Sequence, residues 1–383
     1  MEKIIRAMMD LIAGEVCEKP IDYSQYRFSG EELARLYDLS KSHDLAHLVG
    51  DALIKNDLIE NHEIQAKFQK QIMLAVYRYE KIRFESDRLR DLFNGNEIRF
   101  IPLKGAVIRD CYPEPWMRTS CDIDMLVPAG QVDEVAQLIV ERLGYTYRKK
   151  NYHDISLLSD SGVHLELHHT IRENKKNIDG LLSDCWSYAT AYDRYEYRFD
   201  SEFLLFHQFA HAFHHFLDGG CGVRPCLDVF LLERKTRFDR ETLDSMLTGA
   251  GIKKFSDAIS KLGAIWFEND LHSDTTRLIE QFVLSGGVYG NAENSAAVGQ
   301  QTERGRLGYI LHRLWLPYEL LCLSYPRLHG RRYLQPFYEV KRWFRVFDPD
   351  VRKRKRKALS AIGAVSDEKK SDVNRMLHEL GLL

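Results

Sequence analysis

The chain lacks a disulfide framework and a long apolar run. Its seven cysteines are scattered, and only Cys221 and Cys226 lie close together, so the sequence predicts neither a disulfide-rich fold nor a cysteine zinc site. No segment approaches the ~18 uncharged residues that a membrane-spanning helix needs. The N-terminus alternates charged and apolar residues and lacks the apolar core of a signal peptide. We expect reduced thiols in a cytoplasmic protein without a membrane span.

The chain also lacks a large net charge. Its 383 residues include 54 Lys and Arg against 56 Asp and Glu, a formal net charge of -2, so binding to nucleic acid or an anionic membrane would need a local patch. Residues 352–357 are an uninterrupted run of six cations. Because acidic residues flank this run, we interpret it as the solvated face of a helix. The alternative is that this basic segment binds nucleic acid.

Hydrophobic periodicity indicates helical regions on both sides of a segment that contains strands. We predict an α+β fold in five parts: a helical N-terminal region (1–95), an α/β core (96–200), a helical region (201–290), a loop or linker (291–305) and a helical C-terminal region (306–383). Residues 291–305 are assigned as a loop because they are rich in Gly, Asn, Ser and Gln.

Two aspartates share one face of a predicted strand. In residues 121–127 a single apolar residue separates Asp122 from Asp124, and successive strand side chains point to opposite faces. Neighbouring carboxylates raise each other's pKa unless a cation lies between them. Hard oxygen ligands of this kind suit Mg²⁺.

A hairpin follows, with strands predicted at 155–158 and 163–167. Its second strand places His164, Glu166 and His168 on the face opposite its apolar residues. Glu166 therefore supplies a third carboxylate to the predicted metal site beside the two aspartates.

The turn before the aspartates has features that suit phosphate. A short β-branched and aromatic run at 98–103 leads into Lys104, Gly105 and Ala106, and the bare backbone N–H groups of such a turn can approach a phosphate. Lys104 and Arg118 are candidate phosphate counter-charges. Alternatively, Arg118 pairs with an aspartate and orients the strand.

These groups match the needs of nucleotidyl transfer. Catalysis of that reaction is mostly positioning and electrostatic stabilisation by divalent metal and cationic side chains, and two metals can stabilise the attacking and the leaving oxygen. Asp122, Asp124 and Glu166 are the candidate metal ligands and catalytic residues.

The chain resembles the DNA polymerase beta-type nucleotidyltransferase superfamily. Within it, the chain is similar to a bacterial uncharacterised nucleotidyltransferase-like family. The similar segments are Leu103-Lys104-Gly105, Tyr112-Pro113, Arg118, Asp122 to Val127, Glu166-Leu167-His168, His211, Asp228 and residues 286–290. The resemblance implies a small mixed β-sheet core, a nucleoside triphosphate on the Gly105 turn, and Mg²⁺ on the three carboxylates.

From the resemblance we expect a transferase that uses Mg²⁺, with Mn²⁺ as an alternative, and ATP as the NTP. The acceptor stays open among protein, RNA and small molecules. One departure is Gly105-Ala106, where the superfamily usually has Gly-Ser or Gly-Gly, so Lys104 is expected to replace the missing hydroxyl. The departure also leaves open a non-catalytic nucleotide-binding regulatory or adaptor protein.

Four histidines mark the helix predicted at 203–216. His207 and His211 have the spacing of a helical two-histidine zinc motif, but the residue after the first histidine is Gln208 and not the glutamate of that motif. We therefore expect that one or two of these histidines line a cleft, and a separate zinc site is the less favoured interpretation. His168 and His211 are candidate cleft-lining residues. Arg224 and Asp228 either form a helical ion pair or reach the nucleotide.

Overall fold

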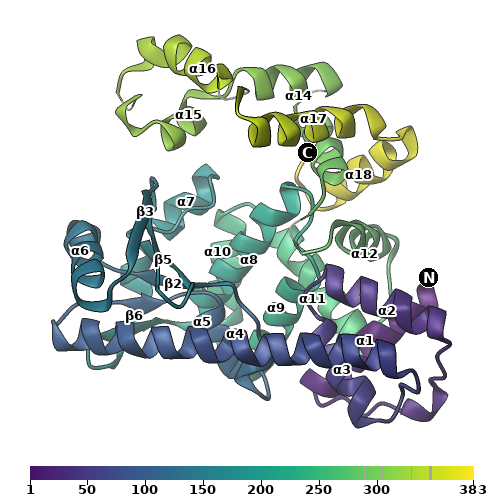
Figure 1. Ribbon diagram of the computed structural model, residues 1–383. Coiled ribbons are helices and arrows are strands. Elements are labelled where there is room, and N and C mark those ends of the chain that lie inside the picture. Colours follow the sequence, from purple (N-terminus) through teal and green to yellow (C-terminus); the bar gives the residue numbers. More distant parts are fainter. Residues whose placement is uncertain (289, 304, 329, 345–346) are drawn as a thin grey trace. The chain divides into compact units, whose positions relative to one another are not determined.

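The computed structural model describes residues 1–288, 290–303, 305–328, 330–344 and 347–383, and Figure 1 shows its ribbon. The chain forms two compact units. The first unit comprises Met1–Ala210 and Val223–His272, and the second unit comprises His211–Gly222 and Ser273–Leu383. All the strands of the described residues belong to the first unit. The division into parts drawn from the sequence stays a prediction, except for the loop expected at 291–305.

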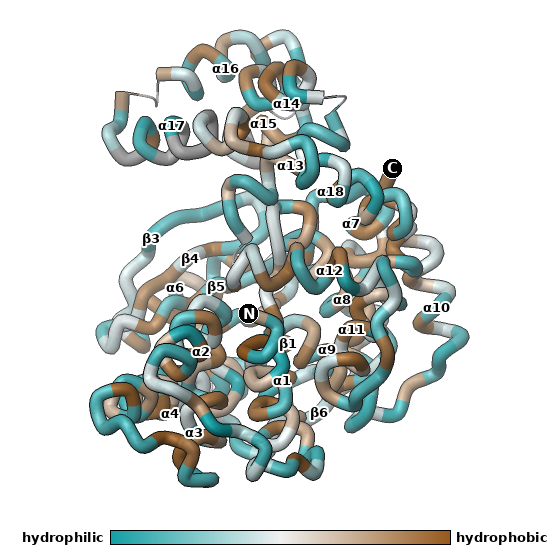
Figure 2. Tube along the Cα trace, turned by 90° about the vertical axis from the view of Figure 1, so that its right-hand side faces the viewer, coloured by the Kyte–Doolittle hydropathy of each residue, from teal (hydrophilic) through white to brown (hydrophobic). Residues whose placement is uncertain are grey.

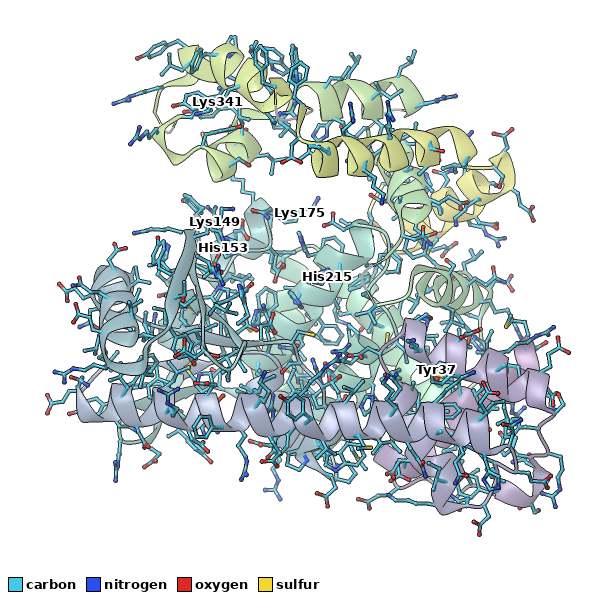
Figure 3. The ribbon with its side chains drawn as sticks, viewed as in Figure 1. Tyr37, Lys149, His153, Lys175, His215 and Lys341 are labelled. Atoms are coloured by element: carbon cyan, nitrogen blue, oxygen red, sulfur yellow. The ribbon has the colours of Figure 1, made fainter. Side chains whose placement is uncertain are left out.

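The N-terminal helices are α1 (Glu2–Val16), α2 (Gly30–Ser42), α3 (Ala46–Lys55) and α4 (His62–Gly95). Helices α2 and α3 pack on the long helix α4, and α1 packs on α2, α3 and the later helix α11 (Lys253–Glu268). The sequence explains two of the helix starts, because the side chain of Ser29 caps α2 and that of Asn61 caps α4. Tyr37 of α2 contacts Phe68 of α4 edge-on, with ring centroids 5.1 Å apart (Figure 3).

A five-stranded mixed sheet forms the centre of the first unit, as predicted. Its strands are β1 (Ile101–Pro102), β2 (Asp122–Leu126), β3 (Thr146–Lys150), β4 (Asp154–Leu158) and β5 (His164–His168), in the order β1-β2-β5-β4-β3. β2 and β5 are parallel, and the other neighbours are antiparallel. The predicted hairpin is confirmed as β4 and β5.

Sequence patterning missed β3 and a two-stranded sheet of β6 (Ala189–Asp193) and β7 (Glu196–Phe199). All five residues of β3 are exposed, and Figure 2 draws this strand mostly in hydrophilic colours. Such a strand has no buried face and therefore no alternating pattern to detect. The strand expected at 98–103 is shorter in the structure, since only Ile101–Pro102 is in β1.

One face of the sheet is apolar and covered by helices. Ile123, Leu165 and Leu167 belong to the same buried cluster as Ile139 of α6 (Val132–Leu143) and Phe93 of α4. Gly144 ends α6 in a left-handed conformation, φ 75°, which glycine adopts without strain. The helices leave the opposite face of the sheet to the polar side chains of β2 and β5.

The remaining helices, in chain order, follow β1 and continue to the C-terminus. They are α5 (Gly105–Ile108), α7 (Lys176–Leu182), α8 (Ser201–Leu217), α9 (Arg224–Lys235), α10 (Arg240–Gly249), α11 (Lys253–Glu268), α12 (Asp274–Gly286), α13 (Ala292–Thr302), α14 (Gly305–Leu314), α15 (Tyr318–Ser324), α16 (Gln335–Phe344), α17 (Pro349–Ala364) and α18 (Asp367–Glu379). The predominantly helical flanks are therefore confirmed.

The loop predicted at 291–305 is wrong, because α13 occupies most of it. The side chain of Asn291 accepts a hydrogen bond from the backbone N–H of Asn294 and so caps the helix. Asn294 is itself buried and donates to the carbonyl of Phe282 at 3.1 Å. The polar residues that suggested a loop thus serve as a helix cap and a buried hydrogen bond.

The seven cysteines are all free thiols. Among the described residues, no helix combines the length and the apolar character needed to cross a membrane.

We predict that Leu165→Ala destabilises the first unit by about 2–5 kcal/mol, because Leu165 is fully buried at the centre of the sheet. Urea denaturation measures this loss. Leu271→Ala is the control, since Leu271 is 82% exposed. An equal, small effect of both changes would contradict this account of the core.

Candidate functional site

The site is built on the parallel pairing of β2 and β5. In this register Asp124 lies opposite Glu166, and Asp122 lies opposite His164. Alternation then puts these four side chains on the polar face, because the residues between them belong to the buried cluster. The predicted placement of the carboxylates on neighbouring strands is what the structure shows.

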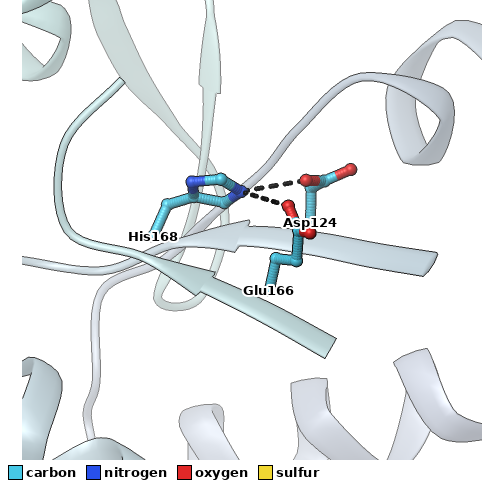
Figure 4. A group of neighbouring side chains, drawn as sticks. All are labelled: Asp124, Glu166 and His168. Carbon is cyan, nitrogen blue, oxygen red and sulfur yellow. Dashed lines mark hydrogen bonds and ion pairs between the residues drawn. The ribbon is translucent and has the colours of Figure 1, made fainter. Parts of the chain in front are cut away.

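Asp124, Glu166 and His168 form a compact group of potential metal ligands. One ligand atom from each lies within 4.8 Å of the others. The Nε2 atom of His168 is 2.9 Å from Oδ1 of Asp124 and 3.5 Å from Oε2 of Glu166 (Figure 4). Two carboxylates and an imidazole within this span could bind one divalent cation.

Two cations neutralise Asp124 in the structure. Lys104 Nζ donates to its Oδ1 at 2.8 Å, and His168 is the second partner. Burial alone raises the pKa of Asp124, but the charge of Lys104 and the contacts with His168 outweigh burial and hold it well below its usual range. Burial alone lowers the pKa of His168, yet its hydrogen bonds to Asp124 and Glu166 raise it to about 9. His168 is therefore protonated at neutral pH.

Asp122 lies outside the group of three, two residues before Asp124 on the same face of β2. Burial and then the charge of Asp124 raise the pKa of Asp122. For Glu166 the pKa is lowered, first by its hydrogen bond with His168. The sequence grouped Asp122, Asp124 and Glu166 as metal ligands. The structure adds His168, which alternation placed on the same polar face and which was expected to line the cleft.

Lys104 has an unusual backbone conformation. Its φ of 48° and ψ of -123° resemble the first central residue of a type II′ turn, a position that favours glycine. The flanking N–H of Leu103 donates to the carbonyl of Asp124 at 3.0 Å. The strained turn thus lies beside β2 and directs the lysine ammonium to Asp124.

The predicted phosphate turn follows at Gly105 and Ala106. It opens α5, which is only four residues long. An added Cβ at Gly105 would lie 3.5 Å from Ser120 and 3.6 Å from Arg118, so the turn backbone lies close to the loop that leads into β2. Its ability to bind phosphate stays a prediction.

Arg118 is held by Asp228 of α9. Its guanidinium makes hydrogen bonds of 2.8, 3.0 and 2.8 Å with the two carboxylate oxygens, and the Tyr112 hydroxyl donates to Asp228 at 2.8 Å. The side chains of Arg118 and Asp228 are only 11% and 4% exposed. This supports the interpretation that Arg118 pairs with an aspartate and orients the segment before β2.

Arg224 has a separate partner. It donates to Asp44 at 2.8 Å and to the carbonyl of Thr119 at 3.0 Å, and the Thr119 hydroxyl also donates to Asp44. The ion pair considered between Arg224 and Asp228 is wrong, since each residue binds the loop before β2 through its own contacts. Both residues position that loop, and a direct role at a nucleotide stays a prediction for them.

Arg109 is a cation that the sequence analysis missed. It lines a cavity of about 360 Å³ with Ala106 and the arginines 83, 90 and 198. Arg109 donates to the carbonyl of Gly105 at 2.9 Å and to the hydroxyl of Ser120 at 3.2 Å. Within the described part of the chain, no carboxylate lies at ion-pair distance from it. Its position four residues after Gly105 was the available signal.

The histidine helix lies partly in each unit. His211 belongs to the second unit, where its Nε2 is 3.2 Å from Nε2 of His215, the residue labelled in Figure 3. Among the described residues, Asp124, Glu166 and His168 are the group of three or more potential ligands, and the histidine helix contributes none to it. A role for His211 in lining the cleft stays a prediction.

We predict that Asp228→Asn destabilises the first unit by about 3–5 kcal/mol, because it leaves the buried Arg118 charge without its partner. Urea denaturation measures the loss. The control is Asp133→Asn, which removes an exposed carboxylate that pairs with Lys150; it should cost under about 1 kcal/mol. Equal stabilities of the two variants would show that the pair does not hold the loop.

Comparison with known proteins gives one match. The model of the family described as Uncharacterised nucleotidyltransferase matches residues 29–268, which include the sheet, the acidic side chains and the Arg118–Asp228 pair. No curated protein and no solved structure matches the chain. Because the match covers more than half of the sequence, the chain belongs to this uncharacterised nucleotidyltransferase family.

Proposed function

We propose that the protein is a metal-dependent nucleotidyltransferase. It would transfer a nucleoside monophosphate from an NTP, with ATP as the expected donor, to a hydroxyl or phosphate of an acceptor. The observation that carries the proposal is the group of Asp124, Glu166 and His168, whose ligand atoms lie within 4.8 Å of one another in a member of this family.

The residues at the site fit a divalent cation. Asp122, Asp124 and Glu166 provide three carboxylates against two cations, Lys104 and His168, so the cluster retains negative charge. Asp124 and Glu166 would hold Mg²⁺ or Mn²⁺, with Asp122 beside them and His168 able to serve as a ligand after losing its proton. The bound metal would neutralise phosphate oxygens and make the acceptor oxygen more nucleophilic.

In the reaction, the acceptor oxygen bonds to the α-phosphorus and the bond to pyrophosphate breaks. Lys104 would stabilise the negative charge of the phosphates once the nucleotide draws it from Asp124. Glu166 is the more accessible carboxylate, with 31% of its side chain exposed against 6% for Asp124. We therefore propose that a Glu166 Oε atom accepts the proton of an acceptor hydroxyl.

Arg109 would provide the phosphate counter-charge for which Arg118 was a candidate. Arg118 is engaged by Asp228, whereas Arg109 contacts the Gly105 carbonyl and shares a cavity with Ala106. The cavity therefore reaches the turn at which we expect the triphosphate.

A second candidate function is a nucleotide-binding regulatory or adaptor protein without turnover. Lys104 and His168 compensate the charge of the Asp124 carboxylate from within the chain, so this carboxylate does not need a metal as its partner. The Gly105-Ala106 sequence also lacks the usual hydroxyl. Nucleotide binding that is indifferent to Mg²⁺ and to Glu166→Gln, measured by calorimetry, would favour this function.

We predict that the protein labels an acceptor in a cell extract supplied with Mg²⁺ and an NTP labelled at the α-phosphate. Asp122→Ala/Asp124→Ala should lower labelling by about 100-fold or more, because it removes carboxylates that hold the metal. Chelation with EDTA should stop labelling, and added Mg²⁺ should restore it. Asp133→Asn is the matched control with an exposed carboxylate. Equal labelling by the double variant and the wild type would refute the transferase.

We predict that Arg109→Gln weakens NTP binding by about tenfold, because it removes a charged donor next to the phosphate turn. Calorimetry with a non-hydrolysable NTP and Mg²⁺ measures the affinity. The control is Arg83→Gln, which removes a cation from the same cavity that is 57% exposed and paired with Glu80. If both variants bind as tightly as the wild type, Arg109 has no role at the nucleotide.

A further inference from the structure

Among its described residues, the segment from residue 305 to residue 347 exposes more hydrophobic side chains than it buries. Ten of the 19 large hydrophobic residues that are exposed in the described structure lie between Leu307 and Phe347. The same stretch buries only four hydrophobic residues among those described: Tyr309, Leu321, Cys322 and Leu328. A soluble surface rarely concentrates apolar side chains in this way unless they contact a partner.

The exposed residues form stripes along two helices of the second unit. Leu307, Leu311 and Leu314 recur at four- and three-residue spacing on α14, so they share one face. Tyr309, which is buried, lies at about 200° from Leu307 at ~100° per residue and therefore on the opposite face. Figure 2 shows apolar stretches at α14.

The second stripe lies on α16 and adjoins the first. Phe337, Val340 and Phe344 follow helical spacing and are all exposed. The indole Nε1 of Trp343 donates to the carbonyl of Leu314 at 2.9 Å, so this side of α16 lies at the C-terminal end of α14. We call these two stripes the apolar surface of α14 and α16.

The local core is too small to need these side chains. Leu321, Cys322 and Leu328 form a separate buried cluster with a few partly buried neighbours. A polar contact also holds the segment together, since the buried Glu339 accepts hydrogen bonds from Arg342 and from the N–H of Leu316. The packing of α14, α15 and α16 against one another therefore does not use the apolar surface.

The segment that carries the apolar surface, together with the basic run that follows it, is rich in positive charge. Residues 305–357 contain 14 Lys and Arg against 4 Asp and Glu, in a chain whose formal net charge is -2. Lys341 of α16, labelled in Figure 3, is exposed, as are Arg306 and Arg313 on α14. Arg352, Lys353 and Arg356 are exposed on α17, within the basic run.

We propose that the apolar surface of α14 and α16 docks on an anionic lipid membrane, with the helices lying in the interface and the basic run of α17 facing the lipid headgroups. Amphipathic helices with Leu, Phe and Trp on one face and Lys and Arg beside it bind the headgroup region in this manner. Basic segments at a lipid surface add attraction to anionic headgroups. The chain would bind as a peripheral protein.

The chemistry of the surface argues against two other occupants. Two copies of the chain meeting through this surface would bring two strongly basic segments together, and like charges repel. Nucleic acid would match the cations, but aliphatic side chains such as Leu307, Leu311 and Leu314 have no aromatic ring with which to stack on bases. An anionic membrane accounts for the apolar and the basic residues together.

The test is sedimentation of the full chain with vesicles. Vesicles of phosphatidylcholine alone should retain little protein, and equimolar phosphatidylcholine and phosphatidylserine should retain most of it, with retention falling as salt rises. Leu307→Ser/Leu311→Ser/Phe344→Ser should weaken partitioning by about tenfold or more. Arg352→Gln/Lys353→Gln/Arg356→Gln should do the same and flatten the salt dependence.

The matched control is Met73→Ser/Tyr77→Ser, which removes exposed apolar side chains from α4 in the first unit. It should bind vesicles as the wild type does, and circular dichroism should show that all variants keep their helices. Equal retention on both vesicle types would overturn the proposal, as would wild-type retention by both triple variants. The proposal is wrong if the wild type does not bind vesicles. Dimerisation through the leucines would then identify the surface as a protein interface, and binding of a short RNA or DNA through the basic run would identify a nucleic-acid interface.

Discussion

The buried carboxylate of Asp124 determines how the rest of the site is arranged. It lies on the central parallel pair of strands, where water cannot solvate it, and a charge in that position needs compensation from the protein. Lys104 from the preceding turn and His168 from the neighbouring strand provide it. The turn, β2 and β5 are thereby tied together by one charge. The same compensation is what an incoming cation and nucleotide would have to rearrange.

A second buried carboxylate fixes the loop that leads into β2. Asp228 binds Arg118 and Tyr112, while Asp44 binds Arg224 and Thr119. The loop before β2 is thus held from α9 on one side and by a residue between α2 and α3 on the other. Helices far from the acidic cluster in sequence therefore determine where β2 begins. The family match over residues 29–268 includes both groups of contacts.

Strand alternation made the core of the site predictable from sequence. Apolar residues at 123, 125, 165 and 167 specified the buried face, and the polar face followed because the side-chain period of a strand is two. The same rule placed His168 on that face but gave no distance, so its contact with Asp124 could not be foreseen. Register between two strands distant in sequence depends on tertiary packing, which a local pattern does not contain.

The elements and contacts that the sequence did not predict also depend on tertiary packing. β3 escaped detection because it is exposed on both faces, and α13 because Asn291 and Asn294 serve as cap and buried donor where their composition suggested a loop. Arg118 and Arg109 are equivalent in sequence terms, since both are arginines near the glycine turn. Only the three-dimensional structure shows that Asp228 engages the first and that the second faces a cavity.

Lys104 illustrates a compromise between folding and chemistry. Its backbone occupies a conformation that costs a non-glycine residue roughly 1–3 kcal/mol, and glycine would relieve that strain at once. Glycine, however, would leave Asp124 without its ammonium partner and the turn without a cation. Loss of the partner of a buried carboxylate costs about 3–5 kcal/mol, which is more than the strain. The ion pair with Asp124 therefore keeps the backbone of this turn in a conformation that it would not adopt by itself.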